Sequence, residues 1–297
     1  MRQSTDLLVI GGDGLIGRAV VRCARQLGRR VLRTSRRESP GGALPLDLGR
    51  DDVAAWEPPP ARAAILAAAV GSQERCVHDR EGTARVNVEA TVTLARKLAA
   101  QGTFVVFPSS NLVFDGATPW HRADEAVAPR TEYGRQKAET ERQLLDLGAS
   151  VAVVRLTKVW GPYVPLLADW AVALRRHRPV HPYSDAVVAP VWLDDVTEVL
   201  DRIAARRLAG LHQLSGDVDV RYADIARRLA KRLGVDPALV QPVPSMLQGG
   251  EGFPAHTTLA PAGEGIRCEV AVSWAVIEAV IDEACDRAEG HGVKVAS

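Results

Sequence analysis

Seven residues near the start of the chain constrain its fold more than any other segment. Gly11-Gly12-Asp13-Gly14-Leu15-Ile16-Gly17 stands between an apolar run, Leu7–Ile10, and a helical pattern, Leu15–Leu27, and satisfies both G-x-x-G-x-x-G and G-x-G-x-x-G. Glycines in such a strand–turn–helix unit permit a tight turn and let backbone N–H groups approach a pyrophosphate at the positive end of the helix dipole. The segment therefore predicts a dinucleotide site, formed by Gly11, Gly14, Leu15, Ile16 and Gly17.

Strand-like and helical patterns alternate along the first half of the chain. The strand-like runs are Leu7–Ile10, Arg30–Thr34, Ala63–Ala67, Phe104–Phe107 and Val151–Leu156, and the helical stretches between them are Leu15–Leu27, Thr83–Ala100 and Tyr133–Leu147. This alternation is typical of βαβ units. We therefore predict an α/β fold of the Rossmann type, with a doubly wound parallel sheet.

The pattern changes after Gly161, because five prolines fall between residues 162 and 190 and shorten the elements. We predict helices at Leu166–Arg176, Asp194–Arg207, Tyr222–Leu233 and Val272–Arg287, and strands at Val187–Trp192 and Leu211–Leu214. A chain of 297 residues suits two domains. We expect residues 1–160 and 187–214 to form the nucleotide-binding Rossmann domain, and residues 161–186 and 215–297 to form a smaller C-terminal substrate domain.

Charge and hydropathy exclude several classes of function. Lys and Arg number 37 and Asp and Glu number 36, which leaves +1 with His neutral, so neither nucleic acid nor an anionic membrane is expected as a partner. The longest apolar run, Ala63–Val70, is too short to span a bilayer, and Leu7–Ile10 is too short for a signal peptide. The four cysteines are scattered and form no C-x-x-C pair. We expect a cytoplasmic enzyme without a bound metal.

The end of the second predicted strand indicates which nucleotide is bound. An NAD enzyme usually places an acidic residue there for the ribose 2′-hydroxyl, whereas this chain has Arg33-Thr34-Ser35-Arg36-Arg37 and no carboxylate until Glu38. Guanidinium groups and a serine hydroxyl can hold a 2′-phosphate, although a solvated basic turn is the alternative. We predict NADP(H), held by Ser35, Arg36 and Arg37, with Asp47, Leu48, Ala67 and Ala68 as further cofactor-binding residues.

Tyr133 and Lys137 stand four residues apart in a helical pattern, so their side chains share one face. An ammonium group beside a tyrosine lowers the tyrosine pKa from its usual value of about 10 and makes the phenol a usable acid or base. Ser109 and Ser110 follow the strand-like run Phe104–Phe107, at the strand end where doubly wound sheets bind ligands. Combined with the glycine turn, these residues predict a catalytic site.

These motifs resemble those of the extended short-chain dehydrogenase/reductase family, and within it the dTDP-4-dehydrorhamnose reductases. The resemblance covers most of the chain and is carried by Gly11–Gly17, Val86-Asn87-Val88, Ser109–Gly116, Tyr133–Lys137 and Arg155–Gly161. It implies NADPH-dependent reduction of a ketone on a sugar nucleotide or a related polar metabolite. It also implies that Tyr133 donates a proton, Ser110 orients the carbonyl oxygen, Lys137 binds the nicotinamide ribose, and Asn87 holds a relay water.

The chain departs from those reductases near the expected substrate. Asn111-Leu112 replaces the usual Asp-Tyr, Lys158 stands where a Trp is common, and Phe253 replaces an Arg. Dehydratases of the wider family have an Asp-Glu pair after the hydroxyl residue, so dehydration is not expected here. The substrate candidates are Asn111, Lys158 and Trp160, with a solvent-facing lysine and a core tryptophan as the alternatives.

Two other functions suit the same residues. A sugar epimerase would use the Tyr133–Lys137 pair and retain NAD. A non-catalytic NADP-binding regulatory subunit would be similar to the beta subunit of methionine adenosyltransferase, which has a similar Ser-Ser before Val-Phe-Asp-Gly. The presence of Ser110, Tyr133 and Lys137 favours catalysis on a small keto substrate. A homodimer is compatible with the resemblance, although Ala123 stands near a Glu linked in some relatives to a metal-bridged dimer.

Overall fold

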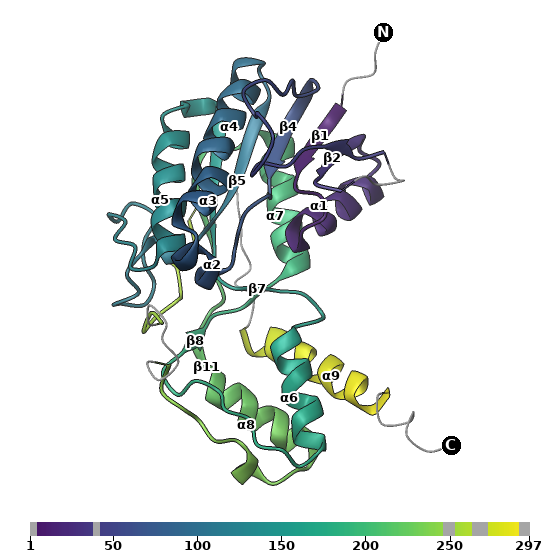
Figure 1. The fold of residues 1–297 in the computed structure, drawn as a ribbon, viewed down its shortest axis with the longest axis vertical. Coiled ribbons are helices and arrows are strands. Elements are labelled where there is room, and N and C mark those ends of the chain that lie inside the picture. Colours follow the sequence, from purple (N-terminus) through teal and green to yellow (C-terminus); the bar gives the residue numbers. More distant parts are fainter. Residues whose placement is uncertain (1–4, 38–41, 246–252, 263–272, 291–297) are drawn as a thin grey trace.

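The computed structural model describes residues 5–37, 42–245, 253–262 and 273–290 (Figure 1). Its centre is a seven-stranded sheet in the order β10-β6-β5-β4-β1-β2-β3, and every neighbouring pair is parallel. Its strands are β1 (Thr5–Ile10), β2 (Val31–Ser35), β3 (Leu44–Pro45), β4 (Ala61–Leu66), β5 (Phe104–Ser110), β6 (Val151–Leu156) and β10 (Gly210–Leu214). The strand order reverses between β1 and β4, at the type of crevice where α/β sheets bind ligands. This confirms the predicted fold class.

Helices cover both faces of the sheet. Figure 1 shows α1 (Leu15–Gln26) and α7 (Leu193–Arg206) on one face, with α4 (Thr91–Ala100) and α5 (Glu132–Leu145) on the other. Side chains alternate along β1, so that Leu7 and Val9 join the core beneath α1 and α7, while Leu8 and Ile10 join the core beneath α4 and α5. Strands buried on both faces need continuous apolar runs, which explains the pattern seen in the sequence.

A smaller group of helices lies beyond one end of the sheet (Figure 1). It contains α6 (Pro165–Arg175), α8 (Tyr222–Leu233) and α9 (Ser273–Gly290). Two short strand pairs accompany it: β7 (Val159–Trp160) with β9 (Val191–Trp192), and β8 (Val187–Val188) with β11 (Val220–Arg221). In the part of the chain that the structure describes, no helix is both long and apolar enough to cross a membrane.

The chain returns to the sheet twice after leaving it. α7 packs beside α1, and β10 pairs with β6. The later segment 256–262 also reaches this region, where Leu259 bridges to His121 and Ala262 bridges to Gln213. Part of the expected substrate domain therefore lies against the loop that follows β5.

Several boundaries differ from the sequence predictions. The strand predicted at Val187–Trp192 is interrupted at Pro190, whose nitrogen carries no hydrogen for a strand ladder. The helix predicted at Thr83–Ala100 is divided into α3 (Arg80–Ala84), a π-helical turn at 85–90 and α4. The sequence also does not predict α2 (Gln73–His78), which is too short for a clear helical period. Three short 3₁₀ turns complete the described elements: Asn111–Val113, Gly148–Ser150 and Pro237–Leu239.

Candidate functional site

The glycine turn lies against the carboxyl ends of β1, β2 and β4. Gly11 has a φ of 83°, and a Cβ there would come within 2.7 Å of the Cα of Ala68. A Cβ on Gly17 would lie 2.1 Å from the carbonyl oxygen of Gly11, so only glycine lets α1 begin this close to the turn. The result is a backbone cradle at the N-terminus of α1, which fits the pyrophosphate of a dinucleotide.

An acidic side chain from this turn reaches the predicted 2′-phosphate site. The Asp13 carboxylate accepts a hydrogen bond from Nη1 of Arg33 at 2.7 Å and another from the hydroxyl of Ser35. Arg36 and Arg37 are exposed beside them. The sequence prediction missed Asp13, because it considered only the carboxylates that follow β2 in the chain. The signal was present in the glycine motif, since that turn lies against the end of β2.

The other predicted cofactor residues lie in the neighbouring loops. Ala67 and Ala68 directly follow β4, where the N–H of Ala67 donates to the carbonyl of Ile10 at 2.9 Å. Asp47 accepts a hydrogen bond from the N–H of Gly49 at 2.9 Å and so stabilises its own turn, while Leu48 is buried in the core. The structure thus brings Ala67 and Ala68 to the glycine turn, whereas contact of Asp47 and Leu48 with a nucleotide stays a prediction.

Helix α5 begins against the segment that follows β5. Oγ1 of Thr131 caps the helix by accepting a hydrogen bond from the N–H of Gly134 at 3.0 Å. A Cβ on Gly134 would lie 2.1 Å from the carbonyl oxygen of Leu112, so glycine is required for this close approach. Nζ of Lys137 then donates to the carbonyl of Pro108 at 2.9 Å. The structure therefore brings the Tyr133–Lys137 segment to the strand end that carries Ser110.

Burial dominates the electrostatics of Tyr133 and Lys137. It lowers the pKa of Lys137 to about 8, against the opposing effect of the Glu141 charge, and it raises the pKa of Tyr133 above its usual range. The expected lowering of the Tyr133 pKa is therefore wrong for this structure. Nζ of Lys137 lies 5.7 Å from the centre of the Tyr133 ring, and desolvation of the phenolate outweighs attraction at that distance. A phenol held in its protonated form suits a proton donor.

Ser110 is the last residue of β5 and is largely buried. Its Oγ accepts a hydrogen bond from the N–H of Leu112 at 3.2 Å and donates a long one, of 3.5 Å, to Oδ1 of Asn111. The Oγ of Ser109 is buried with no hydrogen-bond partner among the described residues. A hydroxyl that accepts one backbone hydrogen bond can still donate to another oxygen, so Ser110 can orient a substrate carbonyl.

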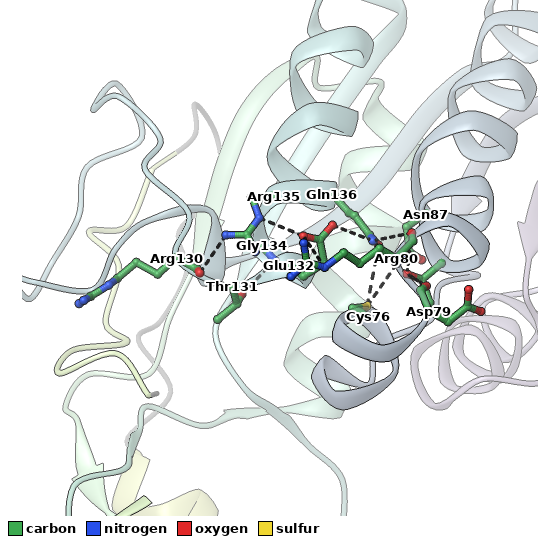
Figure 2. Close-up of polar contacts among 11 residues, drawn as sticks. Cys76, Asp79, Arg80, Asn87, Arg130, Thr131, Glu132, Gly134, Arg135 and Gln136 are labelled. Carbon is green, nitrogen blue, oxygen red and sulfur yellow. Dashed lines mark hydrogen bonds and ion pairs between the residues drawn. The ribbon is translucent and has the colours of Figure 1, made fainter. Parts of the chain in front are cut away.

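A buried polar cluster fixes α5 to the helices that precede it (Figure 2). The side-chain amide of Gln136 donates to Oγ1 of Thr83 at 3.0 Å, and its oxygen accepts from Nδ2 of Asn87 at 2.8 Å. Asn87 also accepts a hydrogen bond from the N–H of Val70 at 2.8 Å and donates to the carbonyl of Val70 at 3.1 Å. Both amide hydrogens of Asn87 are thus bonded within the protein, and these bonds position the loop after β4. The amide oxygen can accept a second hydrogen bond, so the role of Asn87 in holding a relay water stays a prediction.

An ion pair is buried at the other end of α5. Glu141 follows Lys137 by one helical turn and bonds Arg155 of β6 at 2.8 Å. The guanidinium of Arg155 also donates to the carbonyl of Ala123 at 3.2 Å and lies 4.8 Å from the ring of Phe114. These contacts fix the Val-Phe-Asp-Gly loop after β5 to the sheet.

The structure separates the three substrate candidates. Trp160 is only 2% exposed and packs in the main core, so its assignment to the substrate is wrong: no substrate can reach it. Lys158 lies two residues after β6 and is exposed, and its side chain has no hydrogen-bond or ion-pair partner in the described ranges. Partial desolvation by the surrounding protein lowers its pKa. Asn111 is half-buried beside Ser110. No metal-binding group of three or more His, Cys, Asp or Glu exists within those same ranges.

Comparisons with known proteins agree with this geometry. Residues 5–249 match the family model of the RmlD substrate binding domain. Methionine adenosyltransferase 2 subunit beta of Xenopus tropicalis is 27% identical over 169 residues, 53% of this chain and 50% of that protein. The dTDP-4-keto-6-deoxy-D-glucose reductase of Streptomyces niveus is 31% identical over 173 residues, 56% of this chain and 60% of that protein.

A solved structure extends the comparison to most of the chain. The dTDP-4-dehydrorhamnose reductase of Bacillus anthracis str. Ames, in complex with NADP, has a TM-score of 0.77 at 15% identity and covers 95% of this chain and 99% of its own. At that identity the likeness shows the fold. In sequence, the chain spans about half the length of the first curated relatives that it matches.

Proposed function

The chain belongs to the family of the RmlD substrate binding domain, and from that premise we propose that it is an NADP-dependent oxidoreductase. Its reaction is the reduction of a ketone to an alcohol on a sugar nucleotide or a related polar metabolite. The observation that supports this most is the hydrogen bond from Nζ of Lys137 to the carbonyl of Pro108, because it fixes α5 beside the strand end of Ser110.

NADPH, when bound, supplies the hydride for the ketone carbon. Gly11, Gly14 and Gly17, with Leu15 and Ile16, would hold its pyrophosphate at the N-terminus of α1. Ser35, Arg36 and Arg37 would hold the 2′-phosphate, and Lys137 the nicotinamide ribose. The glycine cradle supports this assignment, because a Cβ at Gly11 or Gly17 would collide with neighbouring backbone.

Tyr133 donates the proton that the ketone oxygen gains. Burial raises its pKa, so the phenol is protonated at neutral pH, and an alkoxide is a far stronger base than a phenolate. Lys137 carries its charge below a pKa of about 8 and stabilises the phenolate that proton transfer leaves. Ser110 orients the reacting oxygen through its hydroxyl. Asn111 and Lys158 then contact the polar part of the substrate.

We assign nucleotide binding and substrate binding to different parts of the chain. Residues 1–160 and 187–214 bind the nucleotide, and residues 161–186 and 215–297 contribute the substrate side. The proposal also includes a cytoplasmic location and allows a homodimer.

A regulatory role is the second candidate, and one observation favours it. The chain is 27% identical over 169 residues to methionine adenosyltransferase 2 subunit beta, which is by its name one subunit of a larger assembly. In that case the nucleotide site would persist without turnover. Tyr133 and Lys137 argue for catalysis, since a buried lysine with a lowered pKa is unfavourable for stability and typical of active sites.

The proposed reaction is tested with NADPH that carries deuterium at its transferable position. The purified chain is incubated with a panel of free and nucleotide-linked ketosugars, and products are analysed by mass spectrometry. We expect oxidation of NADPH and deuterium on the carbinol carbon of one product. Isomerised sugar without NADPH oxidation would indicate an epimerase. Failure across the panel, together with a stable protein partner in a pull-down, would indicate the regulatory subunit.

A further inference from the structure

The contact between the glycine turn and the end of β2 bears on the choice between NADPH and NADH. We propose that Asp13 limits the preference of this chain for NADPH, because its carboxylate competes with the 2′-phosphate for Arg33 and Ser35. This role of Asp13 rests on the nucleotide site of the proposed function, and it makes Asp13 a residue that determines the selectivity of that site between NADPH and NADH.

The two donors at the end of β2 are already engaged by Asp13. Nη1 of Arg33 lies 2.7 Å from one carboxylate oxygen, and the hydroxyl of Ser35 bonds the other. Ser35 is the last residue of β2. In a Rossmann sheet, the adenosine ribose lies at this strand end, and its 2′-substituent contacts the side chains there. A 2′-phosphate therefore meets the same two groups that Asp13 holds.

The backbone keeps Asp13 in this position. The N–H of Gly12 donates to the carbonyl of Thr34 at 3.0 Å, and the N–H of Gly11 donates to Oγ1 of Thr34 at 2.9 Å. A Cβ on Gly12 would lie 2.7 Å from the Cβ of Arg33, so the stem of Arg33 packs directly on the turn. Gly11 and Gly12 thus bind the turn to β2 directly before Asp13, which holds the Asp13 carboxylate beside Arg33 and Ser35.

The two nucleotides differ in what they require of Asp13. A 2′-phosphate carries negative charge, so it is repelled by the carboxylate and must displace it from Arg33 and Ser35. A 2′-hydroxyl can donate a hydrogen bond to a carboxylate and displaces no charged contact. Arg36 and Arg37 are exposed and stay available to a phosphate. Asp13 thus weakens NADPH binding while it leaves NADH binding intact.

The test compares dissociation constants of NADPH and NADH for the wild type and for Asp13→Asn, measured by calorimetry in the absence of any ketone. Asparagine keeps the shape and an oxygen acceptor for Ser35, but it removes the charge. We expect NADPH to bind roughly ten- to hundredfold more tightly, the size of a hydrogen bond to a charged group. NADH should bind equally or more weakly.

Asp6→Asn is the matched control. Asp6 accepts a hydrogen bond from the N–H of Arg30 at 2.9 Å and pairs with its guanidinium, but at the opposite end of β1 and β2. This variant should leave both dissociation constants unchanged. An unchanged NADPH-to-NADH ratio in Asp13→Asn, or an equal change for both nucleotides, would overturn the role of Asp13. If neither nucleotide binds the wild type, the proposed function fails as well.

Discussion

Two buried cations lie at helix α5 and differ in their bonding partners: Lys137 belongs to the helix, and Arg155 of β6 binds it through Glu141. Arg155 faces the carboxylate of Glu141 at 2.8 Å and donates to two further oxygens, on Ala123 and Gln213. Lys137 is equally buried, but its only hydrogen bond in the described chain is to the carbonyl of Pro108, and its pKa falls to about 8. A paired buried charge is compatible with a purely structural role, whereas a buried charge without a bonded counter-ion destabilises the fold. The contrast supports the proposed catalytic role of Lys137 and a structural role for Arg155.

Replacing Lys137 should have the largest effect on turnover and no destabilising effect on the fold. Lys137→Met retains the length of the side chain and removes the charge, so turnover should fall by about 10²–10⁴-fold, the usual contribution of acid–base machinery. The unfolding midpoint at neutral pH should equal or exceed that of the wild type, because the desolvated ammonium is gone. Steady-state kinetics and thermal unfolding on one preparation measure both effects. Retained turnover together with a lower midpoint would assign Lys137 a structural role.

Removing the partner of Arg155 should produce the opposite result. Glu141→Gln leaves a guanidinium buried without its carboxylate, which should lower the free energy of unfolding by about 3–5 kcal/mol in urea titrations. Nucleotide binding by the molecules that remain folded should survive. Asp124→Asn is the matched control, since Asp124 and Arg122 form an exposed ion pair and their loss should not move the unfolding midpoint. Equal effects of the two variants would contradict the structural assignment of Arg155.

A smaller effect of the buried Lys137 charge is expected in the pH dependence of turnover and of stability. Turnover should fall as the pH rises through about 8, because Lys137 then loses its proton. Stability should change in the opposite direction: between about 8 and the usual lysine pKa of 10.5, the unfolded chain binds more protons than the folded one, so the free energy of unfolding rises with pH. The checks are kcat/KM and urea unfolding across this range.

Glu141→Gln also modifies that profile. The charge of Glu141 raises the Lys137 pKa, so its removal should shift the alkaline limb of the kcat/KM profile to lower pH. A limb that stays in place or moves upward would show that a group other than Lys137 controls it.

Local patterns in the sequence predicted much of the fold. The glycine turn, the apolar runs of β1 and β6 and the four-residue spacing of Tyr133 and Lys137 each depend on contacts between near neighbours, and the structure has all of them. The interruption at Pro190 was missed, because two short strands and one longer strand share the same apolar composition.

Distant contacts account for the features that the sequence did not predict. Asp13 and Ser35 are hydrogen-bonded although they lie 22 residues apart in the sequence, and Asn87 and Gln136 although they lie 49 apart. Neither pairing produces a periodic pattern in the sequence. Trp160 could not be assigned to the core from composition, since tryptophan is common both in cores and in binding sites. The raised pKa of Tyr133 depends on burial, which only the packed structure defines.

The most direct test of the account is the turnover of Tyr133→Phe with the ketone that the deuterium experiment identifies. Phenylalanine preserves the ring and removes only the hydroxyl that donates the proton. We predict that kcat falls by about 10²–10⁴-fold, while the dissociation constant of NADPH and the unfolding midpoint stay at their wild-type values. Turnover close to that of the wild type would contradict the role of Tyr133 and, with it, the proposed mechanism.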